Sequence, residues 1–149
     1  MIIGVIGGSS CTEEVAAIAE DIGREIANLG ARLVCGGLKG VMEAASKGAK
    51  EADGQTIGIL PGNDKRDANP YIDISIPTGL GYARNMLVVR TADAIIALPG
   101  EYGTLSEIAL ALQIGTPVVG IDTWDIPGVV KAKDVSEAME KVKTILDKS

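Results

Sequence analysis

The amino-acid sequence predicts an α/β fold in which helices cover both faces of a mostly parallel sheet of six to seven strands. Three observations lead to this prediction. Short runs of Val, Ile and Leu alternate along the chain with segments whose apolar residues recur every three to four positions. Several of these runs end in glycine, as tight strand-to-helix turns do. With 46% hydrophobic but only 3% aromatic residues, the chain suits a core of closely layered aliphatic side chains.

The apolar runs are the predicted strands. In chain order they cover residues 2–8, 31–37, 55–62, 71–77, 93–100 and 116–122, followed by a short candidate at 129–132. The run 93–100 is almost continuously apolar, which is typical of a central strand covered on both faces. Residues 71–77 alternate apolar and polar side chains, as an edge strand does. The polar segment 63–70 has no periodicity and is expected to border another part of the molecule.

Helical periodicity fills the intervals between the predicted strands. The predicted helices begin near Thr12, Lys39, Leu80, Tyr102 and Asp134. Gly30 is expected to end the first helix, and Asp134 with Glu137 three residues later is a capping-box-like start for the last. Strands that alternate with helices imply right-handed crossovers. We therefore predict one doubly wound, Rossmann-like domain over residues 1–149.

Composition narrows the chemistry that this chain can perform. Its net charge of −6 disfavours nucleic acid as a partner, because phosphate backbones are held by clustered Lys and Arg. It contains no His, so any general acid or base must be Asp, Glu, Lys, Tyr or Cys. Its two cysteines, Cys11 and Cys35, have no metal-binding spacing, and both are expected to be buried. We expect neither a metal ion nor a resident cofactor.

Two features of the sequence bear on location. No apolar run has the length of a membrane span, and the first residues lack the basic start of a signal peptide. The expectation is therefore a cytoplasmic protein with a small-molecule partner and no membrane contact.

Glycine-rich turns after the predicted strands mark the candidate binding site. In open α/β sheets, ligands bind beyond the carboxyl ends of the strands, where helix N-termini converge. The candidate residues in these turns are Gly7, Gly8, Ser9, Gly36, Gly37, Gly40, Pro99, Gly100, Tyr102, Gly103 and Thr104. No turn matches G-x-G-x-x-G or the Walker pattern, which argues against ordinary dinucleotide binding and P-loop hydrolysis.

Glu107 allows two interpretations. Thr104 and Glu107 have the spacing of a capping box, in which the Thr104 hydroxyl accepts from the Glu107 N–H and the Glu107 carboxylate reaches back to the Thr104 N–H. Alternatively, the carboxylate acts on a molecule held by the preceding turn. We expect both roles, with capping geometry positioning the carboxylate at a ligand site. Gln completes the same box, so Glu107→Gln is expected to preserve folding and abolish the chemistry.

The segment from Arg84 to Glu107 resembles the paired signature of the Lonely-guy family, R-K-x-x-M followed by P-G-G-x-G-T-x-x-E. Arg84 and Asn85 align with the Arg-Lys pair, and the second element aligns with Pro99, Gly100, Gly103, Thr104 and Glu107. Residues 35–45, which include Met42, resemble the family's glycine-rich turn and following helix. The sequence looks closest to the short members related to DNA-processing protein A and to the molybdenum cofactor carrier proteins.

The resemblance implies a phosphate-bearing ligand. The enzymes of the family are phosphoribohydrolases, which cleave the N-glycosidic bond of a nucleoside 5′-monophosphate. Glu107 and Arg84 would then be the catalytic residues, while the glycine turns, Met42 and Asn85 would bind the ligand. Two positions depart from the family pattern. Glu101 replaces the second glycine of P-G-G and Asn85 replaces the Lys, and both changes make the site less positive.

A second class of function stays open from the sequence. A carrier or sensor would hold a nucleotide-like or pterin-type ligand without turnover, as the molybdenum cofactor carriers do. Tyr82 and Tyr102 are candidates to flank a base. The resemblance also implies a homodimer or a higher even oligomer, with the helices after Thr78 and Gly103 as the contact surface. Lysine decarboxylation, the family's other label, is discarded because no lysine is marked as a Schiff-base residue for pyridoxal phosphate.

Overall fold

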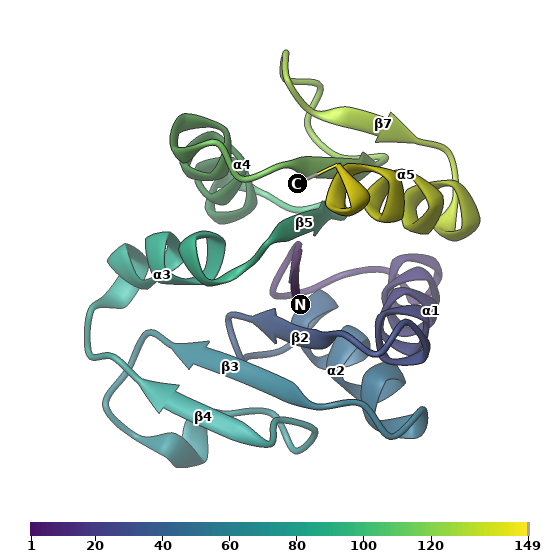
Figure 1. The fold of residues 1–149 in the computed structure, drawn as a ribbon. Helices are drawn as coiled ribbons and strands as arrows, with labels where there is room; N and C mark the ends of the chain where they lie inside the picture. The colour runs from purple at the N-terminus through teal and green to yellow at the C-terminus, as the bar shows by residue number, and fades with distance from the viewer. Residues whose placement is uncertain (149) are drawn as a thin grey trace.

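The strands form one continuous sheet. The computed structural model describes residues 1–148, and its seven strands lie in the order β4–β3–β2–β1–β5–β6–β7 (Figure 1). All neighbouring strands are parallel. Their bounds are β1 (Ile2–Ile6), β2 (Arg32–Cys35), β3 (Thr56–Leu60), β4 (Ile74–Pro77), β5 (Ala94–Ala97), β6 (Val118–Ile121) and β7 (Val130–Ala132). The predicted doubly wound, Rossmann-like fold is confirmed, including the short last strand.

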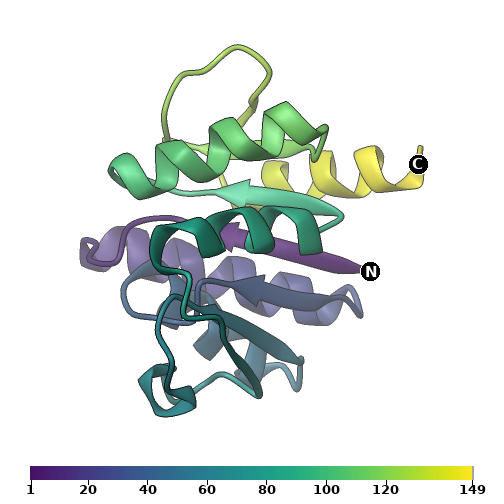
Figure 2. The same ribbon diagram turned by 90° about the vertical axis from the view of Figure 1, so that its left-hand side faces the viewer.

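Helices cover both faces of the sheet. They are α1 (Glu13–Asn28), α2 (Val41–Glu51), α3 (Arg84–Thr91), α4 (Tyr102–Ile114) and α5 (Val135–Asp147), with 3₁₀ turns η1 (Lys65–Asp67) and η2 (Gly81–Ala83). Helices α1, α2 and α5 pack on one face, and α3 and α4 on the other, the face that Figure 2 turns toward the viewer. Parallel strands require such crossover helices, which leave both sheet faces buried.

Each face of the sheet has its own hydrophobic core, because successive side chains along a strand point to opposite sides. In β1, Ile3 and Val5 join the core beneath α1, α2 and α5, whereas Ile6 joins the core beneath α3 and α4. All four residues of β5 are buried, which confirms this strand as an interior one. The β1–β5 pair therefore lies in the buried interior of the sheet.

Two predicted element starts differ from the structure. The fourth strand begins at Ile74 instead of residue 71, because the preceding residues form a turn in which the Asn69 side chain accepts from the Tyr71 N–H. Helix α3 begins at Arg84 instead of near Leu80. Gly79 and Gly81 there have φ values of +66° and +60°, which a right-handed helix cannot contain.

The polar segment 63–70 borders the turn after β2. The Asn69 side chain donates to the Leu38 carbonyl at 2.8 Å, and its N–H donates to the Gly37 carbonyl at 2.9 Å. Of the cysteines, Cys35 is buried as expected, but the expectation for Cys11 is wrong. Cys11 is exposed because it lies in the turn just before Thr12, the N-cap of α1. No helix among residues 1–148 is long and apolar enough to span a membrane.

Candidate functional site

A cavity of about 830 Å³ opens at the carboxyl ends of β1 and β5. This is the switch point of the sheet, since the chain leaves β1 toward one edge and β5 toward the other. The turns after the two strands are joined by a hydrogen bond of 3.0 Å from the Gly8 N–H to the Pro99 carbonyl. The predicted site residues that line the cavity are Gly7, Gly8, Ser9, Met42, Arg84, Asn85, Gly100, Tyr102, Gly103, Thr104 and Glu107.

Four predicted site residues support the cavity wall from behind instead of lining it. They are Gly36, Gly37, Gly40 and Pro99. The Gly36 carbonyl accepts from Arg84 Nη2 at 3.5 Å. Gly40 has φ +66°, and a Cβ atom there would lie 2.3 Å from the Gly8 carbonyl oxygen. These glycines thus allow backbone segments to approach closely, and their role is to shape the cavity.

The N-terminus of α4 opens into the cavity without a side-chain cap. In the described part of the chain, no protein acceptor is present for the N–H groups of Glu101 and Tyr102. Gly100 precedes this helix start, and a Cβ atom there would lie 2.0 Å from Thr104 Oγ1. Free backbone N–H groups at a helix N-terminus attract anions, because the helix dipole places partial positive charge there.

The predicted capping box at Thr104 and Glu107 is wrong. Helix α4 begins at Tyr102, three residues earlier than that box requires, so Thr104 lies inside the first turn. Thr104 is buried against Gly100, and Glu107 lies one turn further along the same helix face. The helix starts earlier because Glu101 already supplies its first carbonyl, which accepts from the Leu105 N–H at 3.0 Å. Glu107 therefore enters the cavity from the second turn.

Glu107 is a buried carboxyl group at the cavity wall, with 8% of its surface exposed. Loss of water contact raises the pKa of Glu107 from its ordinary value to about 7. The positive charge of nearby Arg84 opposes this effect. Near neutral pH both the protonated and the ionised forms of Glu107 are populated, which suits a group that exchanges a proton.

Arg84 is anchored to two strand ends. Its Nε donates to the Ile59 carbonyl at 2.9 Å, its Nη2 donates to the Gly36 carbonyl, and its Nη1 donates to the Asn85 side-chain oxygen. All of these acceptors are uncharged, and no ion pair of Arg84 occurs among residues 1–148. Burial lowers the pKa of Arg84 from its ordinary value, while Glu107 raises it. The guanidinium is thus a fixed positive charge beside Glu107 that an anion can compensate.

Asn85 links this arginine to α4. Its amide nitrogen donates to Ser106 Oγ at 3.1 Å, and Ser106 Oγ donates in turn to the Gly103 carbonyl at 2.7 Å. Asn85 is buried, with 3% of its surface exposed, so the departure from the family's Lys is accommodated by neutral hydrogen bonds. The two halves of the signature are therefore in direct contact in three dimensions.

Sequence reasoning missed part of the cavity lining. The additional residues are Gly81 and Ser106. The cavity is also lined by Tyr82, which was predicted to flank a base, and by Ser10, Leu38, Pro61 and Glu101 from the predicted glycine-bearing strand exits, where open α/β sheets bind their ligands. Ser106 has no such signal, because its partner Asn85 is distant in the sequence. Tyr82 and Tyr102 lie at the rim with 89% and 81% of their surfaces exposed.

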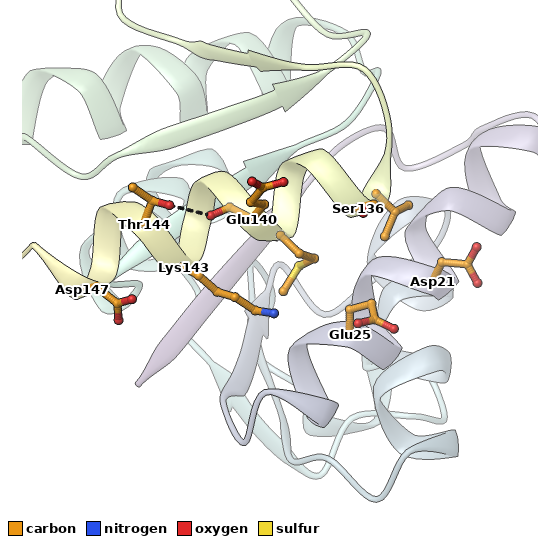
Figure 3. A pocket seen from close by; sticks show the side chains of 9 residues that line it. Asp21, Glu25, Ser136, Glu140, Lys143, Thr144 and Asp147 are labelled. Carbon is orange, nitrogen blue, oxygen red and sulfur yellow. Dashed lines mark hydrogen bonds between the residues drawn. The ribbon is translucent and has the colours of Figure 1, made fainter.

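A second hollow, of about 600 Å³, lies between α1 and α5 (Figure 3). Its lining comes from these two helices alone and includes Asp21, Glu25, Glu140 and Lys143. It contains no strand end and no glycine turn, so it lacks the features of a ligand site in this fold class. The switch-point cavity is the better candidate.

The fold and the cavity define the class of this protein: a doubly wound α/β protein with a buried carboxyl group and a fixed arginine at its switch point. A profile of the SLOG cluster4 family matches residues 1–148, and the chain belongs to this family. An uncharacterised protein of Archaeoglobus fulgidus is 45% identical over 95% of the chain and 91% of that protein. The cytokinin riboside 5′-monophosphate phosphoribohydrolase of Mycobacterium tuberculosis is 32% identical over 74% of the chain. The matched region covers 64% of the length of that enzyme.

Two solved structures that are similar over almost the whole chain are of molybdenum cofactor proteins. The molybdenum cofactor binding protein of Rippkaea orientalis is 40% identical with a TM-score of 0.92, covering 97% of this chain and 96% of that one. The molybdenum cofactor carrier protein of Chlamydomonas reinhardtii is 38% identical with a TM-score of 0.90, covering 98% of each chain. The resemblance to the Lonely-guy superfamily is therefore confirmed, and its relatives include both enzymes and cofactor-binding proteins.

Proposed function

We propose that this protein binds a phosphate-bearing small molecule of nucleotide or pterin type at the switch-point cavity. The uncapped N-terminus of α4 carries the proposal, since its N–H groups at Glu101 and Tyr102 have no protein acceptor in the described chain. Arg84 adds a fixed positive charge that forms no ion pair among residues 1–148. A dianionic phosphate complements both features. The cavity of about 830 Å³ is large enough for a whole nucleotide.

We further propose that the ligand is held and passed on without being cleaved. Two of the solved structures that match almost the whole chain are a molybdenum cofactor binding protein and a molybdenum cofactor carrier. In such a role the cofactor is cargo, and this chain supplies only the cradle. Relative to the family pattern, Asn85 removes a positive charge and Glu101 adds a negative one at a site that an enzyme would use to stabilise a developing anion. Both residues line the cavity.

N-glycosidic hydrolysis is the second candidate, and Glu107 is the observation that favours it. A carboxyl group with a pKa of about 7 beside a fixed arginine can take a proton from water as that water attacks C1′. The C1′–N bond breaks as the water oxygen bonds to C1′, and the base leaves with the bonding electrons and takes up the proton that Glu107 received. The phosphoribohydrolase relatives catalyse this class of reaction on cytokinin riboside 5′-monophosphates.

The deciding experiment measures binding and turnover on the same samples. The purified protein is incubated with AMP, GMP, CMP and IMP, and free base is followed by chromatography, with Glu107→Gln in parallel. Mass spectrometry of the denatured preparation identifies any ligand that copurifies. Binding without base release supports a carrier. Base release that disappears in Glu107→Gln establishes a hydrolase, and the absence of both binding and release contradicts a phosphate-bearing ligand.

We also propose that the chain assembles as a homodimer or a higher even oligomer through the side of the molecule that carries α3 and α4. Exposed apolar side chains lie there, including Leu80, Tyr82 and Leu87. Leu80 and Tyr82 adjoin the cavity rim, so a neighbouring subunit would cover its entrance. Sedimentation equilibrium tests this proposal. We expect Leu80→Asp with Leu87→Asp to give a monomer, whereas Val130→Asp at the opposite sheet edge leaves the assembly intact.

A further inference from the structure

The loop between β6 and β7 contacts the candidate anion site from behind. Trp124, the only tryptophan of the chain, lies in this loop and is half-buried. Its indole Nε1 is positioned to donate to the Gly100 carbonyl at 3.1 Å and to the Glu101 carbonyl at 3.2 Å. The adjacent Thr123 hydroxyl donates to the Leu98 carbonyl at 3.1 Å. One loop thus holds three carbonyl groups of the segment that leads into α4.

Because the peptide bond is planar, these contacts also determine the direction of the N–H group that follows each carbonyl. In a trans peptide the carbonyl and the N–H of the next residue point in opposite directions. The Gly100 carbonyl points toward Trp124, so the Glu101 N–H points away from it. The Glu101 carbonyl also points toward Trp124, so the Tyr102 N–H likewise points away. These two N–H groups are among those at the cavity that have no acceptor among residues 1–148.

The side chains make a second connection between the loop and the cavity. The rings of Trp124 and Tyr102 stack with their centroids 6.4 Å apart and their planes inclined by 26°. Tyr102 is exposed and lines the cavity, so it would be in contact with a bound ligand. A single loop residue therefore contacts both the backbone and a side chain of the candidate site.

We infer that Trp124 is a positioning residue for the ligand site, fixing the orientation of the Glu101 and Tyr102 N–H groups so that they bind a phosphate. This inference rests on the proposed function, because it assigns a role within the same site. The loop that carries Trp124 has no helix and is not part of the signature segment, which ends at Glu107. With Trp124, the proposed ligand site includes a part of the chain that no sequence motif marked.

The test compares Trp124→Phe with Ile126→Ala. Phe keeps the aromatic ring against Tyr102 but removes the N–H donor. Ile126 belongs to the same loop and packs against the core, so its truncation weakens the loop without touching the two carbonyls. Affinities for inorganic phosphate and AMP are measured by calorimetry, and the Glu101 and Tyr102 amide resonances are followed by NMR with and without ligand.

We expect Trp124→Phe to bind phosphate and AMP about tenfold more weakly, because the N–H groups lose their fixed direction. Its Glu101 and Tyr102 amide resonances should move even before ligand is added. Ile126→Ala should lower the melting temperature yet keep both affinities. Equal affinity in Trp124→Phe and the wild type overturns the inference alone. Failure of the wild type to bind either probe, or any mononucleotide, overturns the proposed function and the inference with it.

Discussion

At the residue scale, Glu107 shows why burial matters more than local helix chemistry at this site. Its spacing from Thr104 predicts a capping box, yet α4 begins too early for that arrangement. Glu107 is instead held in the second turn, buried beside a guanidinium that is bonded to carbonyl groups. The carboxyl group therefore owes its raised pKa to loss of water contact.

The first prediction concerns the pH dependence of stability. The folded pKa of Glu107 is about 7, above the ordinary 4.5, so the folded state binds the proton more tightly than the unfolded state does. This stabilising contribution is complete below about pH 4.5 and is lost as the pH rises through 7, at a cost of about 3 kcal/mol. Glu107→Gln should remove this dependence and be the more stable protein at pH 8. Denaturant unfolding at pH 5 and 8 tests it; a wild-type protein equally stable at both contradicts the assignment.

The second prediction concerns the glycines at the start of α4. A Cβ atom at Gly100 would lie 2.0 Å from Thr104 Oγ1 and 2.8 Å from the Gly8 nitrogen, so Gly100→Ala must displace the turn. We expect a loss of about 2 to 4 kcal/mol in the free energy of unfolding. Gly103→Ala is the matched control, because its Cβ would meet no atom and Ala favours a helix. Similar unfolding curves for the two variants would contradict the close packing of this turn.

At the element scale, the helix N-termini are not equivalent. The Thr12 side chain caps α1 by accepting from Val15 N, and Asp134 caps α5 by accepting from Glu137 N. Helix α4 has no such cap, although Glu101 stands at its N-cap position. A cap satisfies N–H groups that an anion would otherwise bind. Helices α2 and α3, whose first turns also line the cavity, have no side-chain cap either, so uncapped helix starts gather at the cavity.

The third prediction follows from the charge of Glu101 at this open helix end. Removing a negative charge should strengthen phosphate binding. We therefore expect Glu101→Gln to bind inorganic phosphate about two- to fivefold more tightly at low salt. The same change should lower stability by less than about 0.5 kcal/mol, because the carboxylate complements the helix dipole. Glu140→Gln on α5 is the control. Calorimetry at two salt concentrations measures the effect, and unchanged affinity in Glu101→Gln would place Glu101 outside the anion site.

At the scale of the whole molecule, the fold depends on close approach between layers. A Cβ atom at Gly23 in α1 would lie 1.9 Å from the Ala45 carbonyl oxygen, and one at Gly48 in α2 would lie 1.8 Å from the Glu20 carbonyl oxygen. The two helices therefore touch backbone to backbone on one face of the sheet. This contact holds α2 in the place where its N-cap, Gly40, supports the turn after β1.

The fourth prediction tests this contact. Gly23→Ala should cost more than about 3 kcal/mol, because α1 and α2 must separate to admit the methyl group. The exposed substitution Ala17→Gly on the same helix gives the propensity effect alone, about 1 kcal/mol. Thermal and denaturant unfolding of both variants measure the difference. If Gly23→Ala costs no more than Ala17→Gly, the two helices are not in backbone contact.

Much of the architecture was predictable because it depends on local patterns. The periodicity of apolar residues located all seven strands and five helices, since each element must bury one face or both. Element starts were less predictable. The conformations of Gly79 and Gly81 moved the start of α3, and glycine identity does not reveal φ.

The candidate site, too, was predictable only in part. The amino-acid sequence by itself determined the doubly wound sheet and its glycine turns, because period and spacing are local properties, and its resemblance to the Lonely-guy family marked Arg84, Asn85 and Glu107. Only the tertiary structure decided that Glu107 is buried with a pKa of about 7, that Asn85 bonds Ser106, and that Trp124 holds the turn before α4. These facts depend on contacts between residues distant in the chain, and desolvation and hydrogen-bond direction arise only when the elements are packed together.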